Sequence, residues 1–206
     1  MTSLRSGVKL TLMKKLSAYL FLILFSFSIP SFADDIQDFQ IEGISLGDSL
    51  LDHYSKEEIT NEIRKDAYSY SDKKYTDSVF KNDGAFIIYD SLQIVFIRSD
   101  ENFIIQGLGG TIWYGKNIDA CLNKMDQIVE ELSTIFIDAK KVDQEIRKHP
   151  SDKSGKSTSQ GVAFFLKDGG ASVRCYHWSE KMNIQDYLQI SIRSKKFNEW
   201  LFKWQQ

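Results

Sequence analysis

Residues that carry metal, redox or nucleophilic chemistry are scarce in this chain. Among its 206 residues are two cysteines and three histidines, with no C-x-x-C pair, no H-E-x-x-H and no G-x-S-x-G element. Two sulfurs are too few for a structural zinc site, and His53, His149 and His177 form no recognisable catalytic pairing. The acidic loop residues do not spell an EF-hand. We therefore expect no catalytic residue, no metal ion and no cofactor.

Long hydrophobic runs are also lacking, apart from the run from Leu16 to Ile29. It follows Lys14 and Lys15 and precedes small residues at the positions that a signal peptidase reads. This order is typical of a secretory signal peptide, so we predict that residues 1–33 are removed by cleavage after Ala33. The alternative is an uncleaved N-terminal anchor, which Pro30 disfavours. Since no cysteine follows the run, a lipoprotein anchor is not indicated.

Removing residues 1–33 would leave 173 residues, enough for one domain, 34–206, or for two subdomains, 34–115 and 116–206. This part carries 22 basic and 28 acidic residues, a net charge of −6. A mildly acidic surface argues against nucleic acid and anionic lipid as partners. Without a second membrane-length run, we expect no stable membrane insertion after cleavage, and a periplasmic or secreted location.

The strongest periodic pattern runs from Asn117 to Phe136. Apolar residues recur there at spacings of three and four, which predicts an amphipathic helix with one buried stripe. Asn117 can cap its first turn, and Asp119 suits the positive end of the helix dipole. The stripe consists of Ile118, Cys121, Leu122, Met125, Ile128, Val129, Leu132, Ile135 and Phe136. We expect the rest of the chain to be arranged around this helix.

The two cysteines favour a disulfide bond if the chain is exported, because exported proteins fold in oxidising surroundings. Cys121 lies on the helix stripe, and Cys175 lies in a segment, Ala171–Trp178, that reads as a strand. Alternation would place Val173, Cys175 and His177 on the face toward the helix. The competing hypothesis is a redox-active or metal-binding pair with His177 as third ligand, and the sequence favours the structural bond.

Strand patterns fill most of the remaining chain. Runs of β-branched and aromatic residues alternate with turn residues at Val79–Phe80, Ala85–Tyr89, Leu92–Arg98, Phe103–Tyr114, Gly161–Leu166, Ala171–Trp178 and Tyr187–Arg193. Gly107, Gly109 and Gly110 interrupt one run, which indicates a bulge or a close crossing by another element. Residues 138–148 fit either a helical extension or a twisted edge strand.

Two further helical segments flank the strands. Capping patterns at Asp48 and Ser55 predict a short helical hairpin that ends near Lys65. Ser194 can cap a terminal helix with Phe197, Trp200, Leu201 and Trp204 on one side. Together these patterns predict an α+β fold, in which antiparallel sheet packs against a central amphipathic helix and a short helical hairpin opens the mature chain.

A candidate binding face follows from the same alternation. If Val173 and Cys175 point inward, the opposite face of the sheet carries Arg174, Tyr176, Trp178, Tyr187 and Arg193. Aromatic rings beside arginines are common at protein and glycan contact surfaces. Two alternatives remain: these residues simply suit a half-exposed strand, or the terminal helix with Trp200 and Trp204 covers this face.

The stretch Ser154-Gly155-Lys156-Ser157 has part of a phosphate-loop pattern. Pro150 stands where the Walker A motif needs its first glycine, and the preceding residues are charged rather than a buried strand. The sequence therefore argues against a nucleotide-binding phosphate loop. A weaker hypothesis remains, in which Lys153, Lys156 and the local amides hold an anionic ligand.

Several segments together resemble an uncharacterised family of small secreted bacterial proteins. These are Gly43–Leu50, the helix with Cys121, the loop Asp152–Ser157 and the strand with Cys175–Trp178. The resemblance implies no activity and no site. We expect an exported, non-catalytic binding or adaptor module that contacts a protein or another envelope component. The rival hypotheses are a small periplasmic hydrolase using His177 with a carboxylate, and a purely structural or inhibitory domain.

Overall fold

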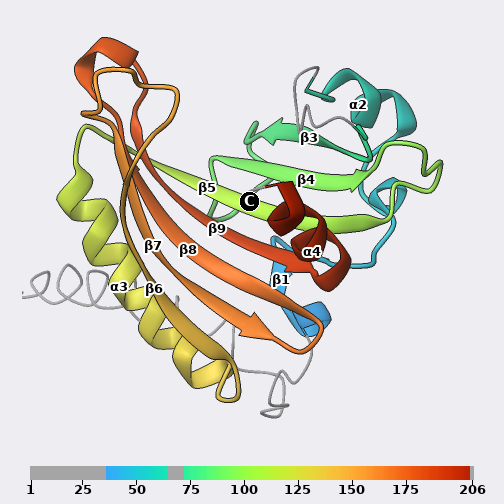
Figure 1. The fold of residues 1–206 in the computed structure, drawn as a ribbon. Helices are drawn as coiled ribbons and strands as arrows, with labels where there is room; N and C mark the ends of the chain where they lie inside the picture. Colours follow the sequence, from blue (N-terminus) through green and yellow to red (C-terminus); the bar gives the residue numbers. More distant parts are fainter. Residues whose placement is uncertain (1–35, 65–71, 205–206) are drawn as a thin grey trace, which may run out of the picture. The chain divides into compact units, whose positions relative to one another are not determined.

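A seven-stranded antiparallel sheet forms the framework of the protein (Figure 1). The structure is a computed structural model, and it describes residues 36–64 and 72–204. The strand order is β3-β4-β5-β9-β8-β7-β6. The strands are β3 Tyr75–Lys81, β4 Ser91–Ile97, β5 Ile105–Gly115, β6 Lys140–Lys148, β7 Thr158–Leu166, β8 Gly169–His177 and β9 Asp186–Ser194. The predicted α+β class is confirmed, whereas the predicted signal peptide, residues 1–33, lies outside the described residues.

Strands from the two halves of the chain meet in the middle of this sheet. β5, from the first half, pairs with β9, from the second, over a register that joins Leu108 to Ile192. Leu108 and Ile192 are both buried. The segment 138–148, for which the sequence allowed helix or strand, contains the edge strand β6, which is largely exposed. The strands on either side of the boundary between the two predicted subdomains therefore belong to one continuous sheet.

Helix α3, Ile118–Ile135, packs against one face of the sheet, which we call the inner face. Asn117 accepts a hydrogen bond from the Ala120 amide at 3.1 Å, so the predicted cap is present. The buried residues of the helix are Cys121, Met125, Ile128, Val129 and Leu132. They contribute to the main core, whose other members come from the inner face of the sheet and from the N-terminal segment.

A disulfide bond joins α3 to β8. The Sγ atoms of Cys121 and Cys175 are 2.00 Å apart, and both cysteines are buried. The sulfur of Cys175 must point toward α3, which fixes the inner face of β8 and, by alternation, its outer face. The predicted pairing of the two cysteines is confirmed.

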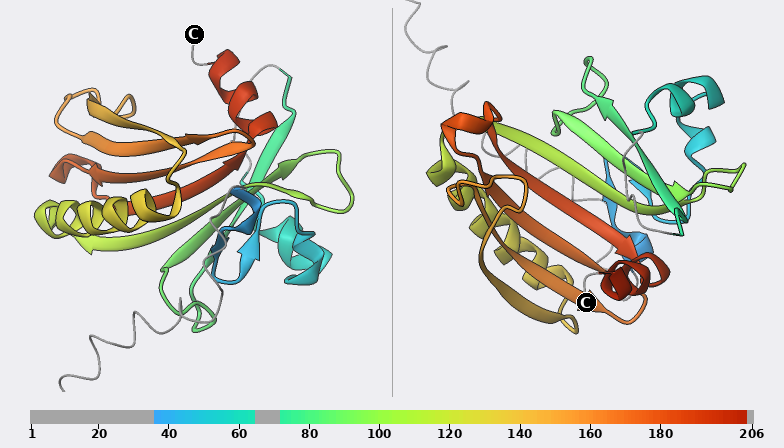
Figure 2. Two further views of the ribbon diagram at one scale, coloured as in Figure 1. Left: turned by 90° about the horizontal axis from the view of Figure 1, so that it is seen from below. Right: turned by 45° about the horizontal axis from the view of Figure 1, so that its top comes forward.

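Helix α4, Lys195–Trp204, lies on the opposite, outer face of the sheet. The left panel of Figure 2 shows α3 and α4 on the two sides of β8 and β9. Ser194 accepts a hydrogen bond from the Phe197 amide at 3.2 Å, which is the predicted cap. Phe197, Trp200 and Leu201 form a second apolar cluster with Tyr75 and Val95. The terminal helix therefore covers part of the outer face.

The N-terminal segment closes the end of the core. It contains the 3₁₀ turn η1, Ile36–Asp38, the hairpin of β1, Gln40–Ile41, with β2, Ile44–Ser45, the turn η2, Leu50–Asp52, and helix α2, Lys56–Asn61. Ser55 and Glu58 form the predicted capping box. The predicted first helix is instead one 3₁₀ turn, capped by Ser49 and not by Asp48, and α2 ends at Asn61.

One predicted strand is wrong. Ala85–Tyr89 forms no strand, because the carboxylate of Glu42 accepts hydrogen bonds from the amides of Ile87, Ile88 and Tyr89. A distant side chain thus satisfies backbone donors that a neighbouring strand would otherwise pair.

The glycines of β5 permit the close approaches that their density predicted. A Cβ atom on Gly110 would lie 2.4 Å from the ring of Tyr89, and one on Gly107 would lie 3.0 Å from the ring of Phe197. The pairing of β4 with β5 also shifts register between Val95 and Phe96. Aromatic rings therefore rest directly on the β5 backbone from both faces.

Within residues 36–64 and 72–204, no helix is both long enough and apolar enough to cross a membrane.

Candidate functional site: the outer face of the sheet

Four of the five predicted face residues lie together on the outer face. Arg174 and Tyr176 project from β8, and Tyr187 and Arg193 project from β9, all half-buried. The rings of Tyr176 and Tyr187 stack with centroids 4.5 Å apart, and Trp113 of β5 meets Tyr187 edge-on at 5.1 Å. Trp113 is 42% exposed. An aromatic row therefore crosses three strands and ends at an open ring.

Trp178, the fifth residue, departs from the prediction. It follows the last residue of β8, so strand alternation no longer sets its direction, and only 6% of it is exposed. Its ring packs against His149 with centroids 4.2 Å apart, and its amide donates to Asp186 at 2.7 Å. Trp178 is thus a buried anchor for the end of β8 and not part of the open face.

A groove of about 500 Å³ lies on the outer face between β6 and α4. Its floor is formed by β7, β8 and β9, and Gln144 of β6 and Asn198 of α4 stand at its sides. Three of its lining residues are arginines: Arg147, Arg174 and Arg193. None of the described residues that line it is Asp or Glu. The groove is therefore positively charged in a chain whose formal net charge is −2.

Serine hydroxyls orient two of these arginines. Arg174 Nη1 donates to Ser159 Oγ at 3.2 Å, and Arg193 Nη2 donates to both Ser172 Oγ and Ser191 Oγ at 3.2 Å. The Ser159 hydroxyl is a neutral acceptor, so it orients the guanidinium group of Arg174 without cancelling its charge. The arrangement can therefore present fixed positive donors to a ligand in the groove.

The two stacked tyrosines keep their protons at neutral pH. Burial raises the pKa of Tyr176, although the charges of Arg174 and Arg193 act in the opposite direction. Burial is also the main cause that raises the pKa of Tyr187. Both side chains thus carry neutral hydroxyl groups beside the arginines and bring no negative charge to the face.

A second hollow, of about 240 Å³, lies beside the groove, and Arg193 lines both. Gly107 and Gly109 form its floor, and Gln93 and Gln189 line it, with a hydrogen bond of 3.3 Å between their side chains. Because glycine has no side chain, these two residues leave the hollow open. The hollow is bounded on another side by Phe197 and Leu201 of α4.

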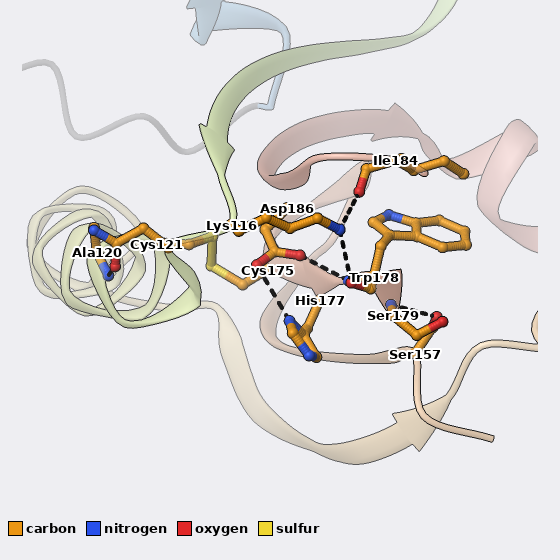
Figure 3. Close-up of polar contacts among 11 residues, drawn as sticks. Lys116, Ala120, Cys121, Ser157, Cys175, His177, Trp178, Ser179, Ile184 and Asp186 are labelled. Atoms are coloured by element: carbon orange, nitrogen blue, oxygen red, sulfur yellow. Dashed lines mark hydrogen bonds and ion pairs between the residues drawn. A yellow bond between two sulfur atoms is a disulfide. The ribbon is translucent and has the colours of Figure 1, made fainter. Parts of the chain in front are cut away.

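His177 is the last residue of β8 and is only half-buried. Its side chain is 40% exposed, and Nδ1 lies 3.2 Å from Oδ2 of the fully buried Asp186 (Figure 3). Lys116 Nζ reaches the same corner and donates to the carbonyl oxygens of Trp178 and Ile184. A histidine with a buried carboxylate on one nitrogen is an arrangement that acid–base catalysis uses, and it also occurs as a structural pair.

Asp152 occupies the anion site that the sequence suggested in the 152–157 loop. Its carboxylate accepts hydrogen bonds from the amides of Ser154 and Ser157 and from the hydroxyls of Ser157 and Ser179. These bonds, with the Ser157 hydroxyl first, hold the pKa of Asp152 well below its usual range. The amides that could have held an external anion are therefore used by a carboxylate of the chain itself.

Sequence reasoning missed several members of the outer-face groove. Arg147 and Gln144 lie in the segment that fitted both helix and strand, so their direction could not be assigned. The periodicity of the terminal helix identifies only its apolar side, to which Asn198 does not belong. A strand assignment for 138–148 would not by itself place both residues on one face, because the register of β6 shifts between Gln144 and Arg147.

Among the described residues, no group of three His, Cys, Asp or Glu side chains lies close enough to hold a metal ion. No family model matches the chain, and comparisons with curated proteins and with solved structures also give no match. The resemblance to small secreted bacterial proteins stays a prediction.

Proposed function

We propose that the protein is an exported, non-catalytic binding module of the cell envelope. Its ligand, a protein or another envelope component, contacts the outer face at Arg174, Tyr176, Tyr187 and Arg193. One observation carries the proposal: the groove on that face is lined by three arginines and by no described acidic residue. Charged side chains converging in a concave, largely preformed site are typical of ligand binding.

Export rests on the N-terminal sequence and agrees with the disulfide bond, since such bonds persist outside the reducing cytosol. The location is then periplasmic or secreted. Mass spectrometry of the protein recovered from the producing cells is expected to find Asp34 as the first residue. An intact N-terminus upstream of Ala33 would contradict cleavage at this position.

Binding is tested by affinity capture from solubilised envelope fractions, with the captured component identified by mass spectrometry. Wild-type protein is expected to enrich one component that the double variant Arg174→Gln/Tyr176→Ala loses. Lys153→Gln is the charge control, because Lys153 is exposed and does not line the groove. Equal recovery with wild type and the double variant would count against the outer face as the contact surface.

A hydrolase at the His177 corner is the second candidate. The observation that favours it is the contact between His177 Nδ1 and the buried carboxylate of Asp186. In such an enzyme His177 would act as general base through Nε2, and Asp186 would orient the ring. Screening wild type and His177→Ala against ester, amide and phosphoester substrates tests it, and hydrolysis that His177→Ala abolishes would favour the enzyme over the binder.

A further inference from the structure

We propose that the groove between β6 and α4 binds an acidic saccharide, a sugar chain that carries carboxylate or phosphate groups. This inference rests on the proposed binding function and names the chemical class of its ligand. It is argued from the charge of the groove, from the donors that its arginines present, and from the structure of its floor and walls.

The charge of the groove selects an anionic ligand. The whole sequence contains six arginines, and three of them, Arg147, Arg174 and Arg193, line this one hollow. The chain otherwise has slightly more acidic than basic residues, 28 against 26. Clustered guanidinium groups in a concave surface attract anions and repel cations at close range. The lining therefore disfavours a cationic ligand, and a neutral ligand would leave the clustered charge unused.

The arginines also favour oxyanions over simple ions. A guanidinium group has five N–H donors in a planar fork that matches the two oxygens of a carboxylate or phosphate. For Arg174, one nitrogen is directed to Ser159 on the neighbouring strand, which fixes the plane of the group. A preoriented fork binds an oxyanion with less loss of side-chain entropy than a mobile lysine would.

The floor of the groove argues against a peptide that adds a strand. β8 pairs with β7 on one side and with β9 on the other, so the backbone donors and acceptors beneath the groove are already used. A peptide that recognises a sheet edge needs unpaired backbone groups. The floor therefore offers only side chains to a ligand. These side chains must recognise the polar groups that the ligand itself carries.

The lining of the groove supplies the partners that sugar hydroxyls need. Gln144 and Asn198 at its sides present amide groups, and Tyr176 on its floor presents a hydroxyl group. The stacked rings of Tyr176 and Tyr187 lead from the groove toward Trp113. Flat apolar rings beside polar groups suit a ligand that has both hydroxyl groups and apolar ring faces. At about 500 Å³, the groove has the size of a small-ligand site and not of a protein interface.

Isothermal titration calorimetry with defined probes tests the proposal. Trigalacturonate carries carboxylates, mannose 6-phosphate carries a phosphate, maltotriose is the neutral control, and hexaglutamate is the acidic peptide. We expect at least one acidic saccharide to bind, with maltotriose at least tenfold weaker. Affinity for the acidic saccharide should fall as salt is raised, since opposite charges in a solvent-open groove are screened.

Groove variants locate the binding. Arg147→Gln is expected to weaken the acidic saccharide about tenfold or more, because it removes a charged donor from an exposed position without disturbing the core. Lys148→Gln is the matched control: it removes the same charge from the next residue of β6, which does not line the groove, and should change affinity less than twofold. Arg174→Lys tests the fork, since it keeps the charge and is expected to lose most of the affinity.

Four results would overturn the inference. These are equal binding of maltotriose, binding of hexaglutamate without either acidic saccharide, no binding of any probe, and binding that Arg147→Gln and Arg174→Lys leave unchanged while thermal unfolding shows them folded. These four results do not bear on the capture experiment. That experiment tests the binding function separately, through the loss of the captured component in Arg174→Gln/Tyr176→Ala. Failure of the capture alone would overturn the proposed function.

Discussion

Asp152 ties together the loop after β6 and the end of β8. Its carboxylate takes hydrogen bonds from Ser154, Ser157 and Ser179, the last of these 27 residues away in sequence. A carboxylate stabilised by donors is favoured in its ionised form, which is why its pKa is lowered. Asp152 is therefore an internal anion that holds one end of the sheet.

We expect Asp152→Asn to lower the free energy of unfolding at neutral pH. The difference from wild type should become smaller as the pH is lowered. The native pKa lies below the unfolded value of about 3.9, so the carboxylate stabilises the fold above that pH and loses this effect as pH falls through the native pKa. Urea unfolding of both proteins from pH 7 to pH 3 measures the difference. A constant difference across this range would contradict the role of the charge, and the exposed Asp138→Asn serves as control.

At the scale of elements, the disulfide joins the central helix to the sheet. A bond between cysteines 54 residues apart should stabilise by about 4 kcal/mol through the reduced entropy of the unfolded chain. We expect Cys121→Ser and Cys175→Ser to lose similar free energies of unfolding, and the double variant to lose little more than either. Denaturant titrations of the three variants measure this, and clearly additive losses would mean that no such bond forms.

The docking of α4 depends on a missing side chain in β5. A Cβ atom on Gly107 would come within 3.0 Å of Phe197, whereas one on Gly109 would meet its nearest atom at 3.4 Å, an ordinary contact. We therefore expect Gly107→Ala to destabilise by about 1–3 kcal/mol. Gly109→Ala, the matched control on the same face, should stay within about 1 kcal/mol.

Chemical denaturation of both glycine variants provides the measurement. Equal effects of Gly107→Ala and Gly109→Ala would mean that α4 does not rest on β5 in solution. A second substitution, Phe197→Leu in the Gly107→Ala background, should recover part of the loss by making room for the new methyl group.

The features of the fold that the sequence predicted correctly depend mostly on local patterns. The periodicity and cap of α3, the capping box at Ser55 and the strand alternation around Cys175 all depend on neighbours within a few residues. Ala85–Tyr89 failed because its amides are held by Glu42, more than 40 residues away. The arginine groove could be predicted only in part for the same reason, since the strand order of the sheet is needed to show that Arg147 and Arg193 line one groove.

At the scale of the whole described molecule, the pairing of β5 with β9 links the two halves of the chain. On the outer face, α4 strengthens this link because it packs against Tyr75 and Val95 of the first half. Each half also covers strands of the other, since η1 contacts β8 and β9, and α3 and α4 contact β5. The predicted subdomains 34–115 and 116–206 should therefore unfold together.

We expect one cooperative transition in guanidinium chloride, with coincident curves from tryptophan fluorescence and far-ultraviolet circular dichroism. Leu108→Ala, at the junction, should lower the free energy of unfolding by about 2–5 kcal/mol and move both curves equally, since Leu108 is only 1% exposed and pairs with Ile192 across the two halves. Ile87→Ala, 79% exposed, is the control and should change it by less than about 0.5 kcal/mol. Two separate transitions, or a Leu108→Ala variant that moves only one probe, would show that the halves are independent units that merely share a strand contact.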